Sequence, residues 1–171
     1  MKISSLAGKS AEQDVLKLGI AADHGGFELK TFLLKKLQDA GYEVIDFGDT
    51  VLKPDDDYPD YVFPLASAIA TGKISHGIAV CGSGVGACIA ANKTAGVRAC
   101  LIHEKFSAHQ GVEDDDMNVI CLGGKVVDNT FAWELVTIFL NAQFSNAERH
   151  VRRLQKTISF ENDTEERIMY K

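Results

Sequence analysis

The chain has 171 residues, 46% of them hydrophobic, and a formal net charge of -6 at pH 7. This length supports one domain with a full hydrophobic core and is short for two, and the negative charge disfavours nucleic acid or an anionic membrane as the main partner. The four cysteines, at positions 81, 88, 100 and 121, form no CxxC pair, so we expect neither a disulfide framework nor a zinc site, and a reducing, cytoplasmic location. No signal peptide and no membrane span of ~20 apolar residues is predicted.

Apolar runs alternate with amphipathic stretches, a pattern typical of parallel strands joined by helices. Strands are predicted at Val15–Ala22, Glu43–Phe47, His76–Val80, Arg98–Ile102 and Val119–Leu122. Helices are predicted near Gly26–Ala40, Tyr61–Thr71, Gly86–Lys93, Lys105–Gly111, Asn129–Gln143 and Asn146–Ser159. We expect an α/β fold with one domain over residues 15–160, a flexible leader at 1–14 and a charged tail at 161–171.

The chemically informative residues follow the predicted strands. Asp23 and His24 follow the first strand, Cys81 the third and His103 the fourth. Because ligands of open parallel sheets bind outside the carboxyl ends of the strands, these side chains predict one site at that edge.

The glycine loop after the third strand carries the strongest signal. Glycines at 82, 84 and 86 let backbone N–H groups turn inward, and a helix starting near Gly86 directs its positive end to the same place. This field favours the thiolate of Cys81, so the segment predicts a base or nucleophile beside an anion site. Two other interpretations remain open: a tight strand-to-helix turn, and a dinucleotide fingerprint with Glu104 as the ribose-binding acid.

Six segments together resemble the ribose-5-phosphate isomerase B and galactose-6-phosphate isomerase family over residues 16–156. These segments are Ala22–Gly26, Asp57–Pro59, Cys81–Gly86, Ala91–Lys93, Gly96–Ala99 and Arg149–Arg153. The resemblance implies a Rossmann-like three-layer α/β/α sandwich with a five-stranded parallel sheet. It also implies a sugar phosphate as ligand, no metal or organic cofactor, and a homodimer or homotetramer with shared active sites.

The resemblance assigns Cys81 as the base that moves a proton between C1 and C2 of an open-chain sugar phosphate through a cis-enediolate. Loop N–H groups and the Ser83 hydroxyl are suited to stabilise the oxyanion. Asp23 would help proton transfer at the substrate oxygens. The implied substrate contacts are His24, Tyr58, Gly82, Gly84, Gly86, Asn92 and Asp115, and the implied phosphate ligands are Arg149, His150 and Arg153.

Each assignment has a structural alternative. Cys81 could be a small apolar residue that closes a strand, and the Asp23-His24 pair could cap the next helix. Tyr58 could be a loop aromatic and Asn92 a helix C-terminal asparagine. The three phosphate ligands could form a solvated basic face.

The chain departs from the family after the fourth strand, where family members carry a His-Asn pair whose histidine is assigned to opening the furanose ring. Asp114 stands at the histidine position. Three explanations remain open: Asp114 itself takes over as a catalytic group, His103 or His109 reaches in, or the substrate is a four-carbon phosphate that cannot form a furanose. A metal site in this acidic run is disfavoured, because consecutive acids point in different directions.

We therefore expect an aldose–ketose isomerase of a phosphorylated sugar, with ribose 5-phosphate and ribulose 5-phosphate as the family's usual pair. Erythrulose 4-phosphate and galactose 6-phosphate are alternative substrates. A non-catalytic nucleotide-binding or sugar-phosphate-binding module is the alternative of another class.

Overall fold

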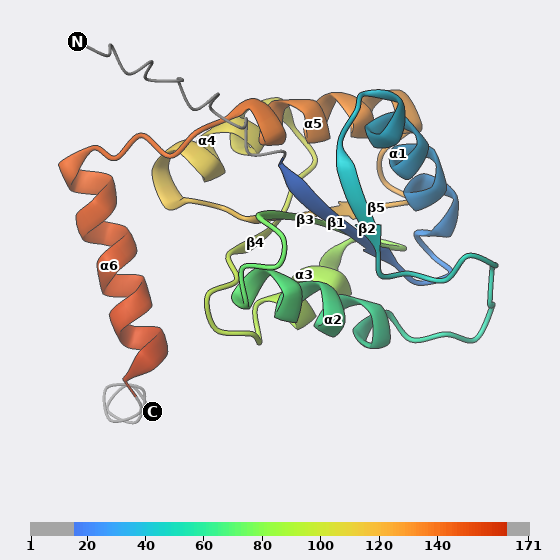
Figure 1. Cartoon of the computed structure of the whole chain (residues 1–171), viewed down its shortest axis with the longest axis horizontal. Helices are drawn as coiled ribbons and strands as arrows, with labels where there is room; N and C mark the ends of the chain where they lie inside the picture. The colour runs from blue at the N-terminus through green and yellow to red at the C-terminus, as the bar shows by residue number, and fades with distance from the viewer. Residues whose placement is uncertain (1–15, 164–171) are drawn as a thin grey trace, which may run out of the picture.

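The computed structural model describes residues 16–163 and contains one parallel sheet of five strands in the order β2-β1-β3-β5-β4 (Figure 1). The strands are β1 (Lys17–Ala22), β2 (Glu43–Asp46), β3 (His76–Cys81), β4 (Ala99–Leu101) and β5 (Val119–Gly123). The central strands β1, β3 and β5 are almost wholly buried, as expected for short apolar runs covered on both faces. The structure confirms the predicted α/β fold and its parallel sheet.

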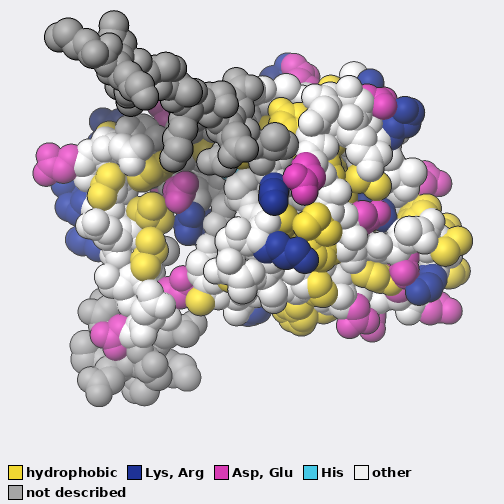
Figure 2. Space-filling model, viewed as in Figure 1, with side chains coloured by type: hydrophobic (Ala, Val, Ile, Leu, Met, Phe, Trp, Pro, Cys, Tyr) yellow, Lys and Arg dark blue, Asp and Glu magenta, His cyan; other side chains and the backbone are white. Residues whose placement is uncertain are grey.

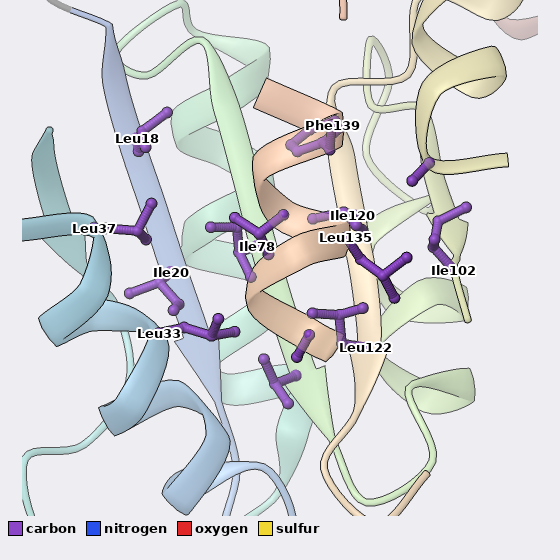
Figure 3. Close-up of a cluster of buried hydrophobic side chains, with 14 of the residues drawn as sticks. Leu18, Ile20, Leu33, Leu37, Ile78, Ile102, Ile120, Leu122, Leu135 and Phe139 are labelled. Carbon is purple, nitrogen blue, oxygen red and sulfur yellow. The ribbon is translucent and has the colours of Figure 1, made fainter. Parts of the chain in front are cut away.

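Helices cover both faces of the sheet and complete three layers (Figure 1). They are α1 (Phe27–Asp39), α2 (Tyr58–Ala70), α3 (Val85–Ala91), α4 (Lys105–Asp115), α5 (Asn129–Asn141) and α6 (Glu148–Asn162). Helices α1, α4 and α5 pack on one face, where the buried side chains include Leu33, Leu135 and Phe139 (Figure 3). Helices α2 and α3 pack on the other face, in a second buried cluster.

All strands are parallel, but the order in which the chain adds them to the sheet reverses at β1. The chain first adds β2 on one side of β1 and then crosses over to add β3 on the other side. In sheets of this kind the crevice at the reversal, outside the carboxyl ends of the strands, is the usual place for a ligand. Here the crevice lies beside the residues that follow β1 and β3.

Two predicted helix boundaries differ from the structure in a way that changes where candidate site residues lie. The second helix begins at Tyr58 rather than Tyr61, since Pro59 occupies the first turn, where its missing N–H costs nothing. The fourth helix continues past Gly111 to Asp115, and Asp116, with a φ of 54°, ends it. Asp114 and Asp115 therefore lie in the last turn of α4 rather than in a loop.

The remaining elements agree with the prediction to within two or three residues, although Val15 lies outside the described residues. Helix α6 crosses the predicted domain boundary and ends at Asn162. The predicted leader and residues 164–171 also lie outside the described part of the chain, so the domain limits stay predictions.

Helix α6 extends away from the sheet (Figure 1). Basic side chains gather on its outer side (Figure 2). Its contacts with the body include the α4 side chains described below and a hydrogen bond from the Gly96 N–H to the Glu161 carboxylate at 2.9 Å. None of the helices within residues 16–163 is long and apolar enough to span a membrane.

Candidate active site

Cys81 is the last residue of β3, beside Gly123 of β5, and only 5% of its surface is exposed. The backbone N–H of Gly84 donates a hydrogen bond to the Cys81 Sγ at 3.1 Å. This bond requires the loop to fold back sharply, and Gly84 adopts a φ of 81°, a conformation that other residues rarely tolerate. The glycine loop thus places a backbone N–H donor on the sulfur, and the role of Cys81 as a base stays a prediction.

The ends of β1, β3 and β5 approach one another closely around this sulfur. A Cβ on Gly25 would lie 2.7 Å from the Gly82 backbone nitrogen, and a Cβ on Gly124 would lie 2.7 Å from the Gly25 carbonyl oxygen. The N–H of Gly124 donates to the Cys81 carbonyl at 2.9 Å. The absence of side chains at these glycines is what allows the three strand ends to meet.

Asp23 follows β1 and is 7% exposed. Its Oδ1 accepts a hydrogen bond from the Gly26 N–H at 3.2 Å, so it does help to cap α1. Burial raises the pKa of Asp23, although the nearby His24 and the Gly26 bond oppose the shift. A carboxyl that holds its proton longer than usual is suited to act as an acid at a substrate oxygen.

His24 is 43% exposed at the side chain and lies against Asp56 from the loop before α2. The ring Nδ1 and the backbone N–H of His24 are each 2.8 Å from the Asp56 Oδ1. The hydrogen bond to Asp56 raises the pKa of His24, and burial opposes that shift. Sequence analysis identified His24 but missed Asp56, which lies 32 residues away in the chain.

Tyr58 lies against the glycine loop, since a Cβ on Gly86 would be 2.8 Å from its ring. Ser83 is exposed, and its Oγ accepts the Val85 N–H at 3.4 Å. The structure therefore brings Tyr58, Ser83 and the three predicted glycines to the Cys81 edge.

A pocket of about 370 Å³ opens at the same edge. His24 and Gly25 line it, together with Glu28 of α1 and with Gly124 and Lys125 after β5. Sequence analysis missed Lys125, which follows the Gly123-Gly124 pair at the end of β5. Lys125 adds a cation to the candidate site, and its backbone N–H donates to the Gly82 carbonyl at 3.0 Å.

Asn92 has a structural role at the end of α3. Its Nδ2 donates to the Ala99 carbonyl at 2.8 Å, and its Oδ1 accepts the Ala99 N–H at 2.9 Å. The side chain therefore joins α3 to the first residue of β4, and its predicted substrate contact stays a prediction.

The predicted phosphate ligands and Asp114 form a second group. His150, which is 3% exposed, places its Nδ1 3.2 Å from the Asp114 Oδ1, and its Nε2 accepts the Arg149 Nε–H at 2.8 Å. Gln110 donates to the other Asp114 oxygen at 2.6 Å. The Ser145 Oγ lies closer still to the same Nδ1, at 2.7 Å, so Ser145 and Asp114 together hold His150, and Arg149 joins the group only through His150. Asp115 and Arg153 are exposed next to this group in the chain.

The two groups lie at opposite edges of the sheet. Asp114 precedes the start of β5, whereas Cys81 is paired with Gly123 at its end. Four residue steps along a strand separate these edges by about 13 Å. Within the described part of one chain, no hydrogen bond or ion pair links Cys81, Asp23 or His24 to the second group. One chain therefore does not assemble all the predicted site residues.

Three further candidate residues, His103, His109 and Glu104, lie at or near α4. His103 is exposed after β4, and His109 lies 3.2 Å from Glu113 on the surface of α4. Glu104, the acid of the dinucleotide alternative, accepts the N–H groups of Phe106 and Ser107 at the start of α4. Because these bonds make Glu104 a helix cap, the dinucleotide interpretation loses its ribose ligand. Across residues 16–163 no group of three or more His, Cys, Asp or Glu side chains is arranged to hold a metal ion.

Comparison with known proteins agrees with this geometry. The sequence profile of the Ribose/Galactose Isomerase family matches residues 18–157. A probable ribose-5-phosphate isomerase B from Mycoplasma pneumoniae is 43% identical over 144 residues, covering 84% of this chain and 94% of the relative. A D-erythrulose-4-phosphate isomerase from Pectobacterium atrosepticum is 36% identical over 130 residues, covering 76% and 86% of the two chains.

A solved structure extends the similarity to the fold. Ribose-5-phosphate isomerase B from Mycoplasma genitalium, with bound ribulose 5-phosphate, superposes with a TM-score of 0.82 at 36% identity. The match covers 87% of this chain and 98% of that one. The chain is therefore an isomerase that belongs to the ribose/galactose isomerase family.

Proposed function

We propose that this chain interconverts ribose 5-phosphate and ribulose 5-phosphate by proton transfer through a cis-enediolate. The observation that carries the proposal is the Cys81 sulfur, buried at the crevice and bonded to the Gly84 N–H. Similarity to ribose-5-phosphate isomerase B supports the choice of substrate.

In the proposed reaction the Cys81 thiolate takes the proton from the carbon next to the carbonyl of the open-chain sugar. Electrons of the broken C–H bond form the enediolate double bond, and the same sulfur returns the proton to the neighbouring carbon. Asp23 and His24 move the accompanying proton between the two oxygens, and the loop N–H groups stabilise the negative charge. The raised pKa of Asp23 supports its role as the acid.

We also propose that the active site is shared between two copies of the chain, in a homodimer or homotetramer. The support is the separation of the Cys81 edge from the Arg149 group in one chain. We also propose a cytoplasmic location, because the four cysteines, which all lie within residues 16–163, form no disulfide framework.

The shared site can be tested by mixing two inactive variants, Cys81→Ala and Arg149→Ala. Random pairing makes half of the dimers mixed, and each mixed dimer regains one of its two sites, so about a quarter of the wild-type rate should return. No recovery in verified mixed dimers would contradict the shared site.

Erythrulose 4-phosphate is a second candidate substrate. Asp114 occupies the position of the family's ring-opening histidine, and both of its carboxylate oxygens are engaged by His150 and Gln110. A four-carbon phosphate needs no ring opening, and one relative carries the name of an isomerase for that sugar.

The two candidates are separated by incubating the protein with each sugar in D2O and following conversion and deuterium uptake by NMR, with galactose 6-phosphate as a third substrate. Preferred turnover of ribose 5-phosphate supports the first proposal, and preferred turnover of the tetrose phosphate supports the second. No conversion and no deuterium uptake with any of the three sugars would contradict both.

A further inference from the structure

His24 is held by a single carboxylate at two of its atoms. The Asp56 Oδ1 lies 2.8 Å from the ring Nδ1 and 2.8 Å from the backbone nitrogen. The Asp56 carbonyl oxygen is 3.3 Å from the same Nδ1. The side chain of Asp56 is only 9% exposed, whereas that of His24 is 43% exposed. The carboxylate is therefore largely withdrawn from water while the imidazole remains accessible.

This contact fixes which ring nitrogen carries the proton. An ionised carboxylate only accepts hydrogen bonds, so Nδ1 must be the donor. Nε2 is then left to face a ligand, and it makes no hydrogen bond to any residue between 16 and 163. The pocket beside His24 is where that nitrogen can meet a substrate oxygen.

The loop that delivers Asp56 is anchored to α1. Lys30, which is 2% exposed, donates from Nζ to the Asp46 Oδ2 and to the Asp49 carbonyl, both at 2.7 Å. Asp49 in turn accepts the Tyr61 hydroxyl at 2.5 Å. These bonds fix both ends of residues 46–61, so the position of Asp56 is set by the fold rather than by a ligand.

We propose that Asp56 is the positioning residue of the active site, holding His24 with Nε2 toward the substrate so that His24 exchanges protons with the sugar oxygens. This inference rests on the proposed isomerase function. Asp56 itself does not touch the substrate in this proposal and acts only through His24.

The electrostatics of the site give the expected direction of the pH effect. The charged groups that face His24 are Asp56 from the loop before α2, Asp23 after β1, Glu28 from α1 and Lys125 after β5. Burial raises the pKa of Asp56, but the hydrogen bonds from His24 and from the Tyr61 hydroxyl together outweigh burial, so the pKa of Asp56 is lowered. The paired carboxylate favours the imidazolium form, so removing its charge must lower the pKa of His24.

Two substitutions separate charge from geometry. Asp56→Asn keeps an oxygen that can accept both His24 bonds but removes the negative charge, whereas Asp56→Ala removes both. Asp55→Asn is the matched control, because it makes the same charge change one residue away and Asp55 is exposed, with no hydrogen bond or ion pair in the described structure.

The first measurement is an NMR titration of the His24 ring, assigned with a His24→Gln variant, in the full-length protein without substrate. Asp56→Asn should move the titration midpoint to lower pH while Nδ1 stays the protonated nitrogen of the neutral ring. Asp56→Ala should lower the midpoint and also mix the two tautomers. Asp55→Asn should leave both properties close to wild type. Identical midpoints in Asp56→Asn and Asp55→Asn would overturn the proposal.

The second measurement is the pH profile of kcat/KM with the sugar phosphate that the wild type converts. Asp56→Asn should move the His24-dependent limb to lower pH by the same shift that NMR records. Asp56→Ala should lower kcat by about 10- to 100-fold with little change in KM, because a misaligned group costs rate rather than affinity. A loss confined to thermal stability, with an unmoved pH profile, would show that Asp56 is merely structural.

Failure of this inference is distinguishable from failure of the proposed function. If the wild-type chain converts no sugar phosphate, the isomerase proposal falls, while the NMR titration still decides whether Asp56 controls His24. If the wild type is active and the Asp56 variants match Asp55→Asn, only the role of Asp56 is refuted.

Discussion

Lys30 tests how the loop that carries Asp56 is held. Its ammonium group is buried and bonded to Asp46 and to the Asp49 carbonyl, each at 2.7 Å. Substitution Lys30→Met keeps the volume and the flexible apolar stem but removes the charge. The change leaves the Asp46 Oδ2 and the Asp49 carbonyl oxygen without the Lys30 donor, while the Asp46 Oδ1 keeps its hydrogen bond from the Gly48 N–H.

Removal of one partner from a fully buried ion pair costs about 3–5 kcal/mol. Because 20% of the Asp46 side chain remains exposed, water can solvate part of its charge, so we expect the lower end, about 3 kcal/mol. For a domain of this size, 1 kcal/mol corresponds to about 2–4 °C in Tm, so Lys30→Met should lower Tm by about 6–12 °C.

The assay is thermal unfolding followed by circular dichroism, with Lys35→Met as the matched control on the same helix. Lys35 also pairs with a carboxylate, Asp39 at 2.9 Å, but the two side chains are 76% and 59% exposed. An exposed pair of this kind contributes at most about 0.5 kcal/mol, so Tm should fall by about 2 °C or less. Addition of Asp46→Asn to Lys30→Met should recover part of the loss, because the unpaired charge is gone. Equal Tm values for Lys30→Met and Lys35→Met would refute this reasoning.

Three further changes test the glycine loop, the Asp23 carboxyl and the Cys88–Cys121 pair. Gly86→Ala should lower kcat/KM by about tenfold with a small loss of Tm, because its Cβ would displace the Tyr58 ring; unchanged kinetics would contradict that placement. Burial raises the pKa of Asp23 above the ordinary value of 3.8, so the folded protein loses stability as the pH rises and Asp23 ionises. Asp23→Asn should abolish this pH dependence of Tm and should lower kcat by about 100-fold. The Cys121 hydrogen bond lowers the pKa of Cys88 to about 7, so alkylation of Cys88, followed by mass spectrometry, should rise steeply near pH 7, and Cys121→Ala should move that rise to higher pH.

Much of the Cys81 edge was predictable from sequence. Apolar runs of strand length alternate with helical periodicity, and that alternation requires a parallel sheet. Once the sheet is parallel, residues that follow β1 and β3 must share one edge, so Asp23, His24 and Cys81 converge whatever the loops do. The glycines at 82, 84 and 86 supplied the second signal, because such a cluster directly after a buried strand has few structural explanations.

The end of α4 was not predictable from the same rules. A glycine such as Gly111 commonly ends a helix. Here the Met117 side chain packs against Gly111, 3.3 Å from where a Cβ on that glycine would lie, and the helix ends instead at Asp116. Tertiary packing therefore overrode local propensity. The resulting position of Asp114, against His150 and away from Cys81, depends on how α6 meets α4, which no local pattern encodes.

Asp56 and Lys125 were missed for a related reason. Asp56 sits in an acidic run that is typical of a solvated loop, and only the long-range bond to His24 distinguishes it from its neighbours. Lys125 follows β5, so the rule that ligands bind outside the carboxyl ends of parallel strands also applied to Lys125. A single lysine after two glycines nevertheless gives little signal until the neighbouring strands are known.

The central claim is that Cys81 is the base of a sugar-phosphate isomerase, and its most direct test is carbon-bound deuterium uptake from D2O by NMR. Wild type and Cys81→Ala would be compared on the substrate that the wild type converts, with Cys100→Ala as the cysteine control on β4, outside the candidate site. Exchange and conversion should both fall by at least about 100-fold in Cys81→Ala, with circular dichroism unchanged, and Cys100→Ala should match wild type. Retained deuterium uptake in folded Cys81→Ala would contradict the account, since another group would then remove the proton.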